Sequence, residues 1–218
     1  MVTYDEKHGN FTLVNRDIIY SSLCITDGIL FGSENRIYKY DYKKRSFKSI
    51  NIKKQEDKGS DVTKYRVQKI IAFSEREALV ATRRDGVYVL DYQTMRLKRL
   101  FSGSNNILQG AYLSSNGYIY LSFWGQGLFC YEKTGKFIKR YTKENSDLTN
   151  NYVLDIVEKE GFLWLATDGG GINRLELSNE NFSNLYHIAG DKNSLPVNSV
   201  TILYKDENEG PVSYTHLT

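Results

Sequence analysis

The sequence predicts an all-β fold, a segment of a β-propeller, and an internal repeat is the first observation behind it. One pattern occurs four times: a short apolar strand, a small turn, then a hydrophobic residue followed four positions later by an acid. The pairs are Ile37 and Asp41, Val87 and Asp91, Leu128 and Glu132, and Ile172 and Glu176. They recur every 41 to 50 residues, and a period in that range made only of strands is typical of propeller blades.

The second observation is that strand-like runs are apolar at consecutive positions. Examples are YIYL (118–121) and LWLA (163–166). Such runs indicate strands that are buried on both faces, as in blades stacked face to face. One four-stranded sheet buries too little apolar surface to offset the conformational entropy lost on ordering it, so the blades must pack on their neighbours.

The fourth repeat predicts the strands of a blade in order. The ranges are 152–157 for a first strand, 158–161 for a turn, 162–167 for a second strand, 172–176 for a third and 182–187 for a fourth. Between the second and third strands, Asp168 is followed by three glycines. Glycine supplies the positive φ values that a tight hairpin needs.

The other repeats align with the fourth. The third has YIYLSF (118–123), a turn at 124–127 and LFCYE (128–132); the second has ALVATR (78–83), a turn at 84–86 and VYVLD (87–91); the first has ILFGS (29–33), a turn at 34–36 and IYKYD (37–41). We therefore predict complete blades at about residues 17–54, 67–104, 107–145 and 152–192.

Both ends of the chain read as parts of further blades. Residues 1–16 repeat the spacing of a third and fourth strand, and residues 199–210 predict the start of another blade. The pattern breaks at residues 211–218, where we expect either non-native sequence, such as a vector junction, or a divergent strand. The chain is therefore expected to be a segment of a larger propeller.

Composition argues against several classes of partner. The 29 basic and 26 acidic residues leave a net charge of +3, and the basic runs, such as Lys43-Lys44-Arg45, are expected on outermost strands, where lysine prevents edge pairing. Nucleic acid is therefore not an expected partner. No apolar run is long enough to cross a membrane, and residues 1–10 do not resemble a signal peptide. Cys24 and Cys130 are expected to be small buried hydrophobic residues.

No catalytic or metal site is predicted. The recurring acids Asp41, Asp91, Glu132 and Glu176 are expected to be structural partners at strand ends. The Asp168–Gly171 turn joins strand to strand and lacks the lysine of a phosphate loop. His8, His187 and His216 lack metal-ligand spacing. We expect no cofactor.

The fourth repeat resembles a known family. Residues 163–176 (LWLATDGGGINRLE), followed by Phe182, Tyr186 and NSLPVNSV (193–200), are similar to the two-component regulator propeller repeat, and SDLTNNYV (146–153) is a weaker copy of the same link. The resemblance covers about residues 17–210. The first two repeats depart from it, because Arg83–Gly86 and Glu34–Arg36 replace the glycine-rich turn.

The resemblance implies the periplasmic sensor region of a hybrid two-component histidine kinase, as found chiefly in Bacteroidetes. There, two propellers typically precede a β-sandwich, a membrane helix and the kinase. It also implies a glycan or oligosaccharide ligand, contact with the rest of the parent propeller and a homodimer of the parent sensor. The segment itself is not expected to be an enzyme.

Candidate ligand-binding residues come from the turns between second and third strands and from the links between blades, which meet on one face of a propeller. They are Arg83, Arg84, Trp124, Gln126 and Asp168; the link from Gln55 to Arg66 is expected on the same face. An exposed indole beside hydrogen-bonding groups suits a sugar ring. The alternatives are that Trp124 packs against the next blade and that Arg83 and Arg84 are solvated loop charges.

Two other functions remain open from the sequence. A propeller enzyme, such as a lyase or a glycan-degrading protein, would need histidines and acids that converge on the channel. A protein-interaction scaffold would need a large apolar or aromatic patch on one face.

Overall fold

The structure is a computed structural model, and it describes residues 2–5, 10–13, 17–52, 62–103, 106–206 and 210–214. Side chains are described for residues 17–52, 63–103 and 106–204. The chain divides into two compact units, Met1–Gly103 and Ser104–Thr218. No helix in the described part is long and apolar enough to cross a membrane.

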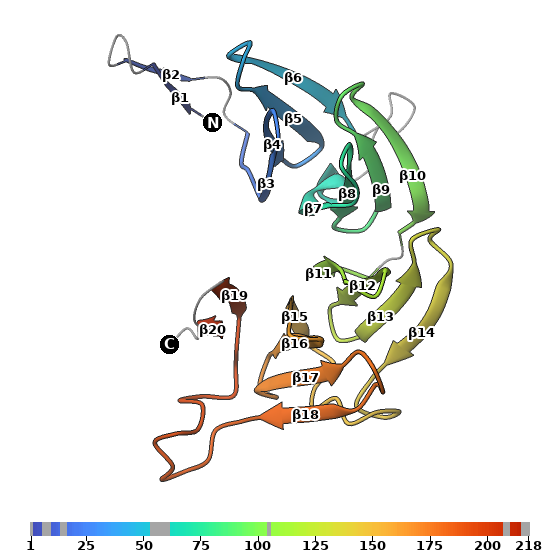
Figure 1. The fold of residues 1–218 in the computed structure, drawn as a ribbon, viewed down its shortest axis with the longest axis vertical. Helices are drawn as coiled ribbons and strands as arrows, with labels where there is room; N and C mark the ends of the chain where they lie inside the picture. Colours follow the sequence, from blue (N-terminus) through green and yellow to red (C-terminus); the bar gives the residue numbers. More distant parts are fainter. Residues whose placement is uncertain are drawn as a thin grey trace. The chain divides into compact units, whose positions relative to one another are not determined.

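The first unit contains two four-stranded antiparallel sheets (Figure 1). The first sheet consists of β3 (Ser21–Ile25), β4 (Gly28–Gly32), β5 (Arg36–Asp41) and β6 (Ser46–Asn51); the second consists of β7 (Val67–Ala72), β8 (Glu77–Thr82), β9 (Gly86–Asp91) and β10 (Arg96–Ser102). A short 3-10 helix, η1 (Val62–Tyr65), precedes β7. Near the N-terminus, β1 (Val2–Asp5) pairs with β2 (Asn10–Leu13).

The second unit contains two more sheets of the same kind and a strand pair. The third sheet consists of β11 (Leu108–Leu113), β12 (Tyr118–Phe123), β13 (Gly127–Glu132) and β14 (Phe137–Tyr141); the fourth consists of β15 (Val153–Lys159), β16 (Phe162–Thr167), β17 (Ile172–Glu176) and β18 (Phe182–Leu185). After them, β19 (Ile202–Asp206) pairs with β20 (Gly210–Tyr214). The predicted all-β fold with four-stranded blades is confirmed, and the expected blade limits and the nature of residues 211–218 stay predictions.

Each sheet is a meander in which neighbouring strands follow one another in sequence. Within each unit, the first strand of one blade packs beside the first strand of the next: β3 beside β7, β11 beside β15, and β15 beside β19. Blades stacked in this way bury both faces of their second strands. Accordingly, five of the six residues of β8 and of β12 are buried, which confirms the reading of the consecutive apolar runs.

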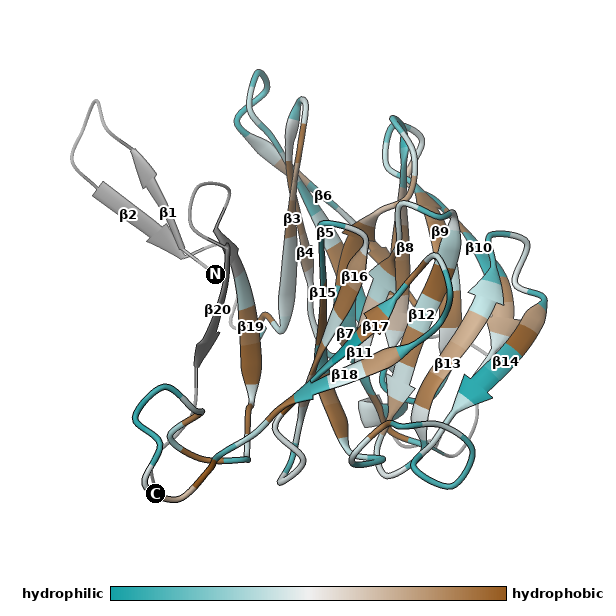
Figure 2. Cartoon of the chain, turned by 60° about the horizontal axis from the view of Figure 1, so that its bottom comes forward, coloured by the Kyte–Doolittle hydropathy of each residue, from teal (hydrophilic) through white to brown (hydrophobic). Residues whose placement is uncertain are grey.

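Outer strands are more polar than the strands that precede them in each blade. Figure 2 shows brown, hydrophobic segments along β12 and β16 and teal, hydrophilic segments on β14 and β18. In β6 four of the six residues are exposed and the other two are half-buried, as expected for a strand at the edge of a sheet.

Two features of individual residues correct the sequence-based expectations. The turn after β15 is only Glu160 and Gly161, both at positive φ (54° and 80°), and the pairing of Lys159 with Phe162 extends the strand past the predicted end at residue 157. A two-residue turn with both residues at positive φ matches the strand twist. Cys24 is exposed rather than buried, because β3 alternates half-buried and exposed positions; Cys130 is buried, as expected.

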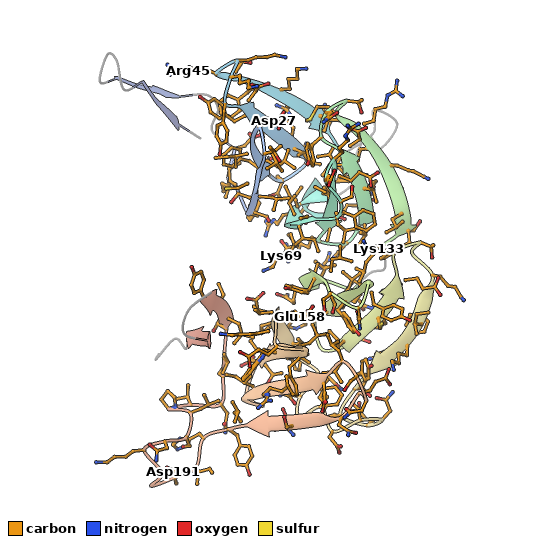
Figure 3. All side chains as sticks on the ribbon, in the orientation of Figure 1. Asp27, Arg45, Lys69, Lys133, Glu158 and Asp191 are labelled. Atoms are coloured by element: carbon orange, nitrogen blue, oxygen red, sulfur yellow. The ribbon has the colours of Figure 1, made fainter. Side chains whose placement is uncertain are left out.

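Polar side chains tie neighbouring blades of the second unit together. The carboxylate of Glu158, on β15 (Figure 3), is 8% exposed and accepts hydrogen bonds from the backbone N–H (2.8 Å) and the hydroxyl of Ser115, in the turn before β12. Asp155 Oδ2 accepts the backbone N–H of Leu203 (3.2 Å) at the other side of the same blade. These buried acceptors therefore fix β15 against both of its neighbours.

Three glycines at one repeat position explain why the third strands begin where they do. Gly86, Gly127 and Gly171 all have positive φ. A Cβ atom on Gly127 or Gly171 would lie 2.2 Å from the carbonyl oxygen of Tyr141 or Leu185, respectively, on the outer strand side. Only glycine permits this approach. The predicted positive φ values in the Asp168–Gly171 turn are confirmed for Gly169 and Gly171, whereas Gly170 does not have a positive φ.

Candidate ligand-binding surface

Two positions of the repeat connect the turn between the second and third strands of a blade with the link that precedes a first strand. We call the first residue of each such turn the turn residue; these are Glu34, Arg83, Trp124 and Asp168. The residue before the first strand of a blade is the link residue; these are Arg66, Ile107 and Tyr152, and Ser199 holds the corresponding position ahead of β19. Within a blade, the N–H of the turn residue bonds the carbonyl of the link residue, at 2.7 Å (Arg83 to Arg66), 2.8 Å (Trp124 to Ile107) and 3.0 Å (Asp168 to Tyr152).

In the second unit, the side chain of one link residue reaches the turn residue of the preceding blade. The rings of Trp124 and Tyr152 meet edge to face, with centroids 5.0 Å apart and an interplanar angle of 78°. Trp124 remains 46% exposed and Tyr152 39% exposed. Trp124 therefore packs against the next blade, as the alternative reading expects, and it still presents an aromatic surface to solvent; its role in ligand binding stays a prediction.

The same contact recurs one blade further along with polar groups. The hydroxyl of Ser199 donates to Asp168 Oδ1 (2.6 Å), and Asn150 Nδ2 donates to the backbone oxygen of Asp168 (2.7 Å). The backbone N–H of Tyr152 in turn donates to Asn150 Oδ1 (2.9 Å). The link Asn150–Tyr152 thus places the aromatic pair and the Asp168 carboxylate on one continuous surface, which we call the loop surface.

Gln126 lies in the same turn as Trp124 but is occupied by a structural contact. Arg140, on β14, donates to the backbone oxygen of Gln126 (2.6 Å) and to its side-chain Oε1 (3.0 Å). At the corresponding position in the second blade, Arg99 pairs with Asp85 at 2.7 Å. The outer-strand arginine therefore fastens the turn, and a ligand would have to share the Gln126 amide with it.

Arg83 and Arg84 belong to the first unit, where the corresponding contacts are ionic. Both are half-buried rather than fully solvated. The link residue Arg66 pairs with the turn residue Glu34 (3.3 Å) and lies over the ring of Tyr20, 4.3 Å from its centroid. The hydrogen bond that Tyr20 donates to Glu34, together with burial, raises the pKa of Tyr20. The predicted link from Gln55 to Arg66 lies largely outside the described residues.

The recurring acids are structural partners at strand ends, as predicted. Asp91 Oδ1 accepts the backbone N–H groups of Gln93 and Thr94, each at 2.9 Å. These bonds, chiefly the one from Thr94, lower the pKa of Asp91. Asp41 holds the following turn in the same way. Among the residues that the structure describes, no group of three or more His, Cys, Asp or Glu side chains is arranged to hold a metal ion.

The sequence reading missed Tyr152, Asn150 and Ser199. The sequence predicts Tyr152 as the first residue of a strand, whereas it is a link residue that precedes β15 and whose ring meets that of Trp124. A signal was available, because an aromatic at a strand start in one copy aligns with Ser199 in the next copy. A position that changes from aromatic to small and polar between repeats is unlike a core position.

Comparisons with known proteins place the fold. No family model matches the chain, and no curated protein matches it. Solved structures do. An extracellular domain of a hybrid two-component system, BT3049 of Bacteroides thetaiotaomicron, has a TM-score of 0.69 and 18% identity over 92% of this chain and 29% of its own. That of BT4673 from the same organism, described as a one-component system, has a TM-score of 0.70 and 16% identity over 98% and 29%.

A third solved structure is from a different class. The WD40 repeats of RRP9 have a TM-score of 0.59 and 11% identity, over 79% of this chain and 52% of that one. WD40 repeats are propeller blades, so the three likenesses together establish the propeller fold. The fold expected from the repeat resemblance is confirmed, since the neighbours include extracellular domains of two-component systems. The chain spans about 29% of the length of those extracellular domains.

Proposed function

We propose that this chain is part of the extracytoplasmic sensing region of a two-component system and that its loop surface binds a glycan or oligosaccharide. The sensing role and the location are supported by the structural likeness to extracellular domains of such systems over more than nine-tenths of the chain. The parent protein would carry the kinase, and this segment would act by binding alone.

The observation that carries the ligand assignment is the half-exposed aromatic pair Trp124 and Tyr152 beside the Asp168 carboxylate. Sugar rings have apolar C–H faces and a rim of hydroxyl groups. An exposed indole offers a flat apolar surface to the first, and fixed carboxylate and amide groups offer hydrogen bonds to the second. Asp168 keeps one carboxylate oxygen, Oδ2, without a hydrogen bond to the described residues.

Calorimetric titration of the chain with neutral oligosaccharides tests this function. Cellotetraose, xylotetraose and maltotetraose are suitable probes, with analysis of the mixtures for cleavage products. We expect saturable binding of at least one probe and no cleavage, with affinity reduced in Trp124→Ala. Release of shorter sugars would instead support a glycan-degrading enzyme, and absence of binding by all three would contradict a neutral-glycan site.

A further inference from the structure

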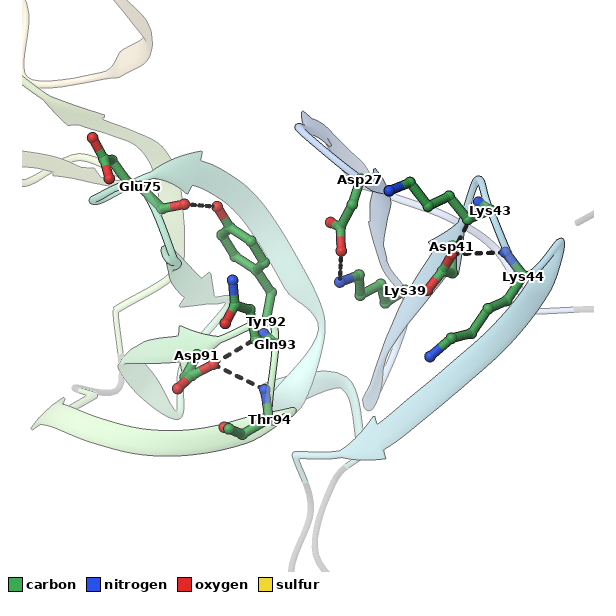
Figure 4. Close-up of polar contacts among 10 residues, drawn as sticks. All are labelled: Asp27, Lys39, Asp41, Lys43, Lys44, Glu75, Asp91, Tyr92, Gln93 and Thr94. Atoms are coloured by element: carbon green, nitrogen blue, oxygen red, sulfur yellow. Dashed lines mark hydrogen bonds and ion pairs between the residues drawn. The ribbon is translucent and has the colours of Figure 1, made fainter.

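A second candidate site lies in the first unit, in a groove between the first and second blades. The groove has a volume of about 240 Å³ and is lined by three lysines, two aspartates, a serine and a glutamine: Lys39, Lys44, Lys48, Asp27, Asp41, Ser46 and Gln93. Figure 4 shows most of these side chains around the ends of β5 and β9. The groove shares no residue with the loop surface.

The floor of the groove is an ion pair between a buried lysine and a half-exposed aspartate. Lys39, on β5, is 6% exposed, and its Nζ lies 2.8 Å from Asp27 Oδ2 and 5.5 Å from the ring centroid of Tyr92. Asp27 Oδ1 is also shielded from solvent but has no hydrogen-bond partner among the described residues. The rest of the Asp27 side chain is half-exposed, so the groove presents a carboxylate that can accept a hydrogen bond from a hydroxyl.

The other charged groups of the groove differ in whether they have partners. Asp41 uses its Oδ1 to hold the backbone N–H groups of Lys43 (3.0 Å) and Lys44 (2.9 Å). Across the described part of the chain, no carboxylate lies within ion-pair distance of the ammonium groups of Lys44 and Lys48. The rim of the groove therefore offers two ammonium donors that lack a carboxylate acceptor.

The corresponding groove between the third and fourth blades shows what satisfies such a lysine. Lys39 pairs with Lys48 across β5 and β6, and Cys130 pairs with Lys139 across β13 and β14, so Lys48 and Lys139 hold the same repeat position. Lys139 forms an ion pair with Glu180 from the turn of the next blade. That groove is smaller, about 90 Å³. There, the protein supplies its own carboxylate.

In the second blade, Met95 holds the repeat position that Glu180 holds in the fourth blade. Both residues lie two positions before the outer-strand residue that pairs with the buried leucine of the third strand, Leu97 with Leu90 and Phe182 with Leu175. Both also have a positive φ, 58° for Met95 and 66° for Glu180. Methionine brings no charge, so the second blade offers Lys48 no carboxylate from this position.

We propose that this groove binds a hydroxylated carboxylate, of the sugar-acid type, whose carboxylate takes the place that Glu180 takes in the other groove. Lys48 and Lys44 bind the carboxylate through charge-assisted hydrogen bonds. A ligand hydroxyl donates to the half-exposed carboxylate of Asp27, which Lys39 holds in place. The available volume admits a single sugar ring rather than only an ion.

Titration calorimetry with D-glucuronate tests the proposal, with D-glucose as its uncharged counterpart and acetate as a carboxylate without hydroxyls. We expect saturable binding of D-glucuronate to the chain and weaker binding of the other two. Met95→Glu should supply the missing carboxylate and weaken D-glucuronate binding by about tenfold or more, whereas Met95→Gln should not. Lys48→Met should also weaken it, while Lys43→Met, a matched loss of charge on the same turn outside the groove, should leave it unchanged.

The outcomes separate clearly. The site would be overturned if D-glucuronate showed no saturable binding to the wild type. It would also be overturned if Met95→Glu and Lys48→Met bound D-glucuronate as tightly as the wild type does. Acetate or D-glucose binding as tightly as D-glucuronate would overturn the assignment to a hydroxylated carboxylate. Far-ultraviolet spectra and melting curves of each variant establish that lost binding is not lost folding. The loop surface is left unaltered by these variants, so either site can fail without the other.

Discussion

The indole ring of Trp124 and the phenol ring of Tyr152 meet edge to face across the boundary between two blades, with centroids 5.0 Å apart. Neither ring is buried. An aromatic pair that joins two blades and remains open to solvent serves packing and recognition together. Within each unit the turn residue of one blade faces the link residue of the next, as Glu34 and Arg66 do in the first unit and Asp168 and Ser199 do one blade after the aromatic pair.

Trp124→Ala should leave the fold intact. The ring is 46% exposed, and an edge-to-face pair contributes only about 0.5–1.5 kcal/mol beyond area burial. We expect a loss of about 1 kcal/mol in the free energy of unfolding and an unchanged far-ultraviolet spectrum. Chemical denaturation measures the first quantity. A loss several times larger would show that Trp124 is a core residue and would remove the basis for a ligand surface.

Gly171→Ala should destabilise the chain far more than Gly161→Ala. Both glycines have positive φ, 72° and 80°, so both substitutions carry the left-handed cost of about 1–2 kcal/mol. At Gly171 the new Cβ would also lie 2.2 Å from the Leu185 oxygen, whereas nothing lies within 4 Å at Gly161. Overpacking adds about 1–3 kcal/mol at Gly171. Equal losses in denaturation experiments would show that the outer strand does not approach the turn this closely.

Glu158→Ala should loosen the contact between the third and fourth blades. It removes both acceptors for Ser115 at an 8% exposed position, and hydrogen bonds to charged groups contribute about 1.5–3 kcal/mol each at most. We expect a loss of about 2–3 kcal/mol, with a smaller loss in Glu158→Gln, which keeps one acceptor. Hydrogen exchange at the Ser115 amide should accelerate in Glu158→Ala. Unchanged exchange there would contradict this role.

Acid should weaken the turns that Asp41 and Asp91 hold. Backbone N–H donors lower the pKa of each carboxyl below its ordinary value of 3.8. A carboxyl with a lower pKa in the folded state stabilises the fold fully above its unfolded pKa, and this contribution is lost as the pH falls through the folded pKa. We expect the stability difference between the wild type and Asp91→Asn to be constant near neutrality and to shrink below about pH 4. Melting curves from pH 7 to pH 3 measure it, and a difference that grows in acid would refute the assignment.

The fold could be predicted from the sequence because each blade of a propeller carries the same pattern of residues. The acid at the end of each third strand recurs in register, as does the glycine at the start of the last three, and stacking explains the apolar runs. The expectation that Cys24 is buried is wrong because β3 alternates between exposed and half-buried positions, which the apolar neighbours of Cys24 do not reveal. The exposure of Cys24 depends on how neighbouring blades pack, which cannot be read from the composition of one strand.

The candidate sites were less predictable for a related reason. The exposure of Trp124 depends on its contact with Tyr152, which lies beyond a whole outer strand and link in the sequence. Gln126 has the residue type expected for ligand contacts, yet Arg140 engages it from the outer strand. The lysine groove is visible only when Met95 is compared with Glu180 in the folded repeat. Contacts between blades decide each of these cases.

The most direct measurement of the central claim uses the two tryptophans of the chain. Trp124 is exposed on the loop surface, and the Trp164 indole nitrogen is shielded from solvent. A proton–nitrogen correlation spectrum therefore shows two indole signals, which Trp124→Phe assigns. During titration with an oligosaccharide that binds, the Trp124 signal should shift to saturation while the Trp164 signal stays in place. A bound oligosaccharide that leaves the Trp124 signal unmoved would show that the loop surface is not the glycan site.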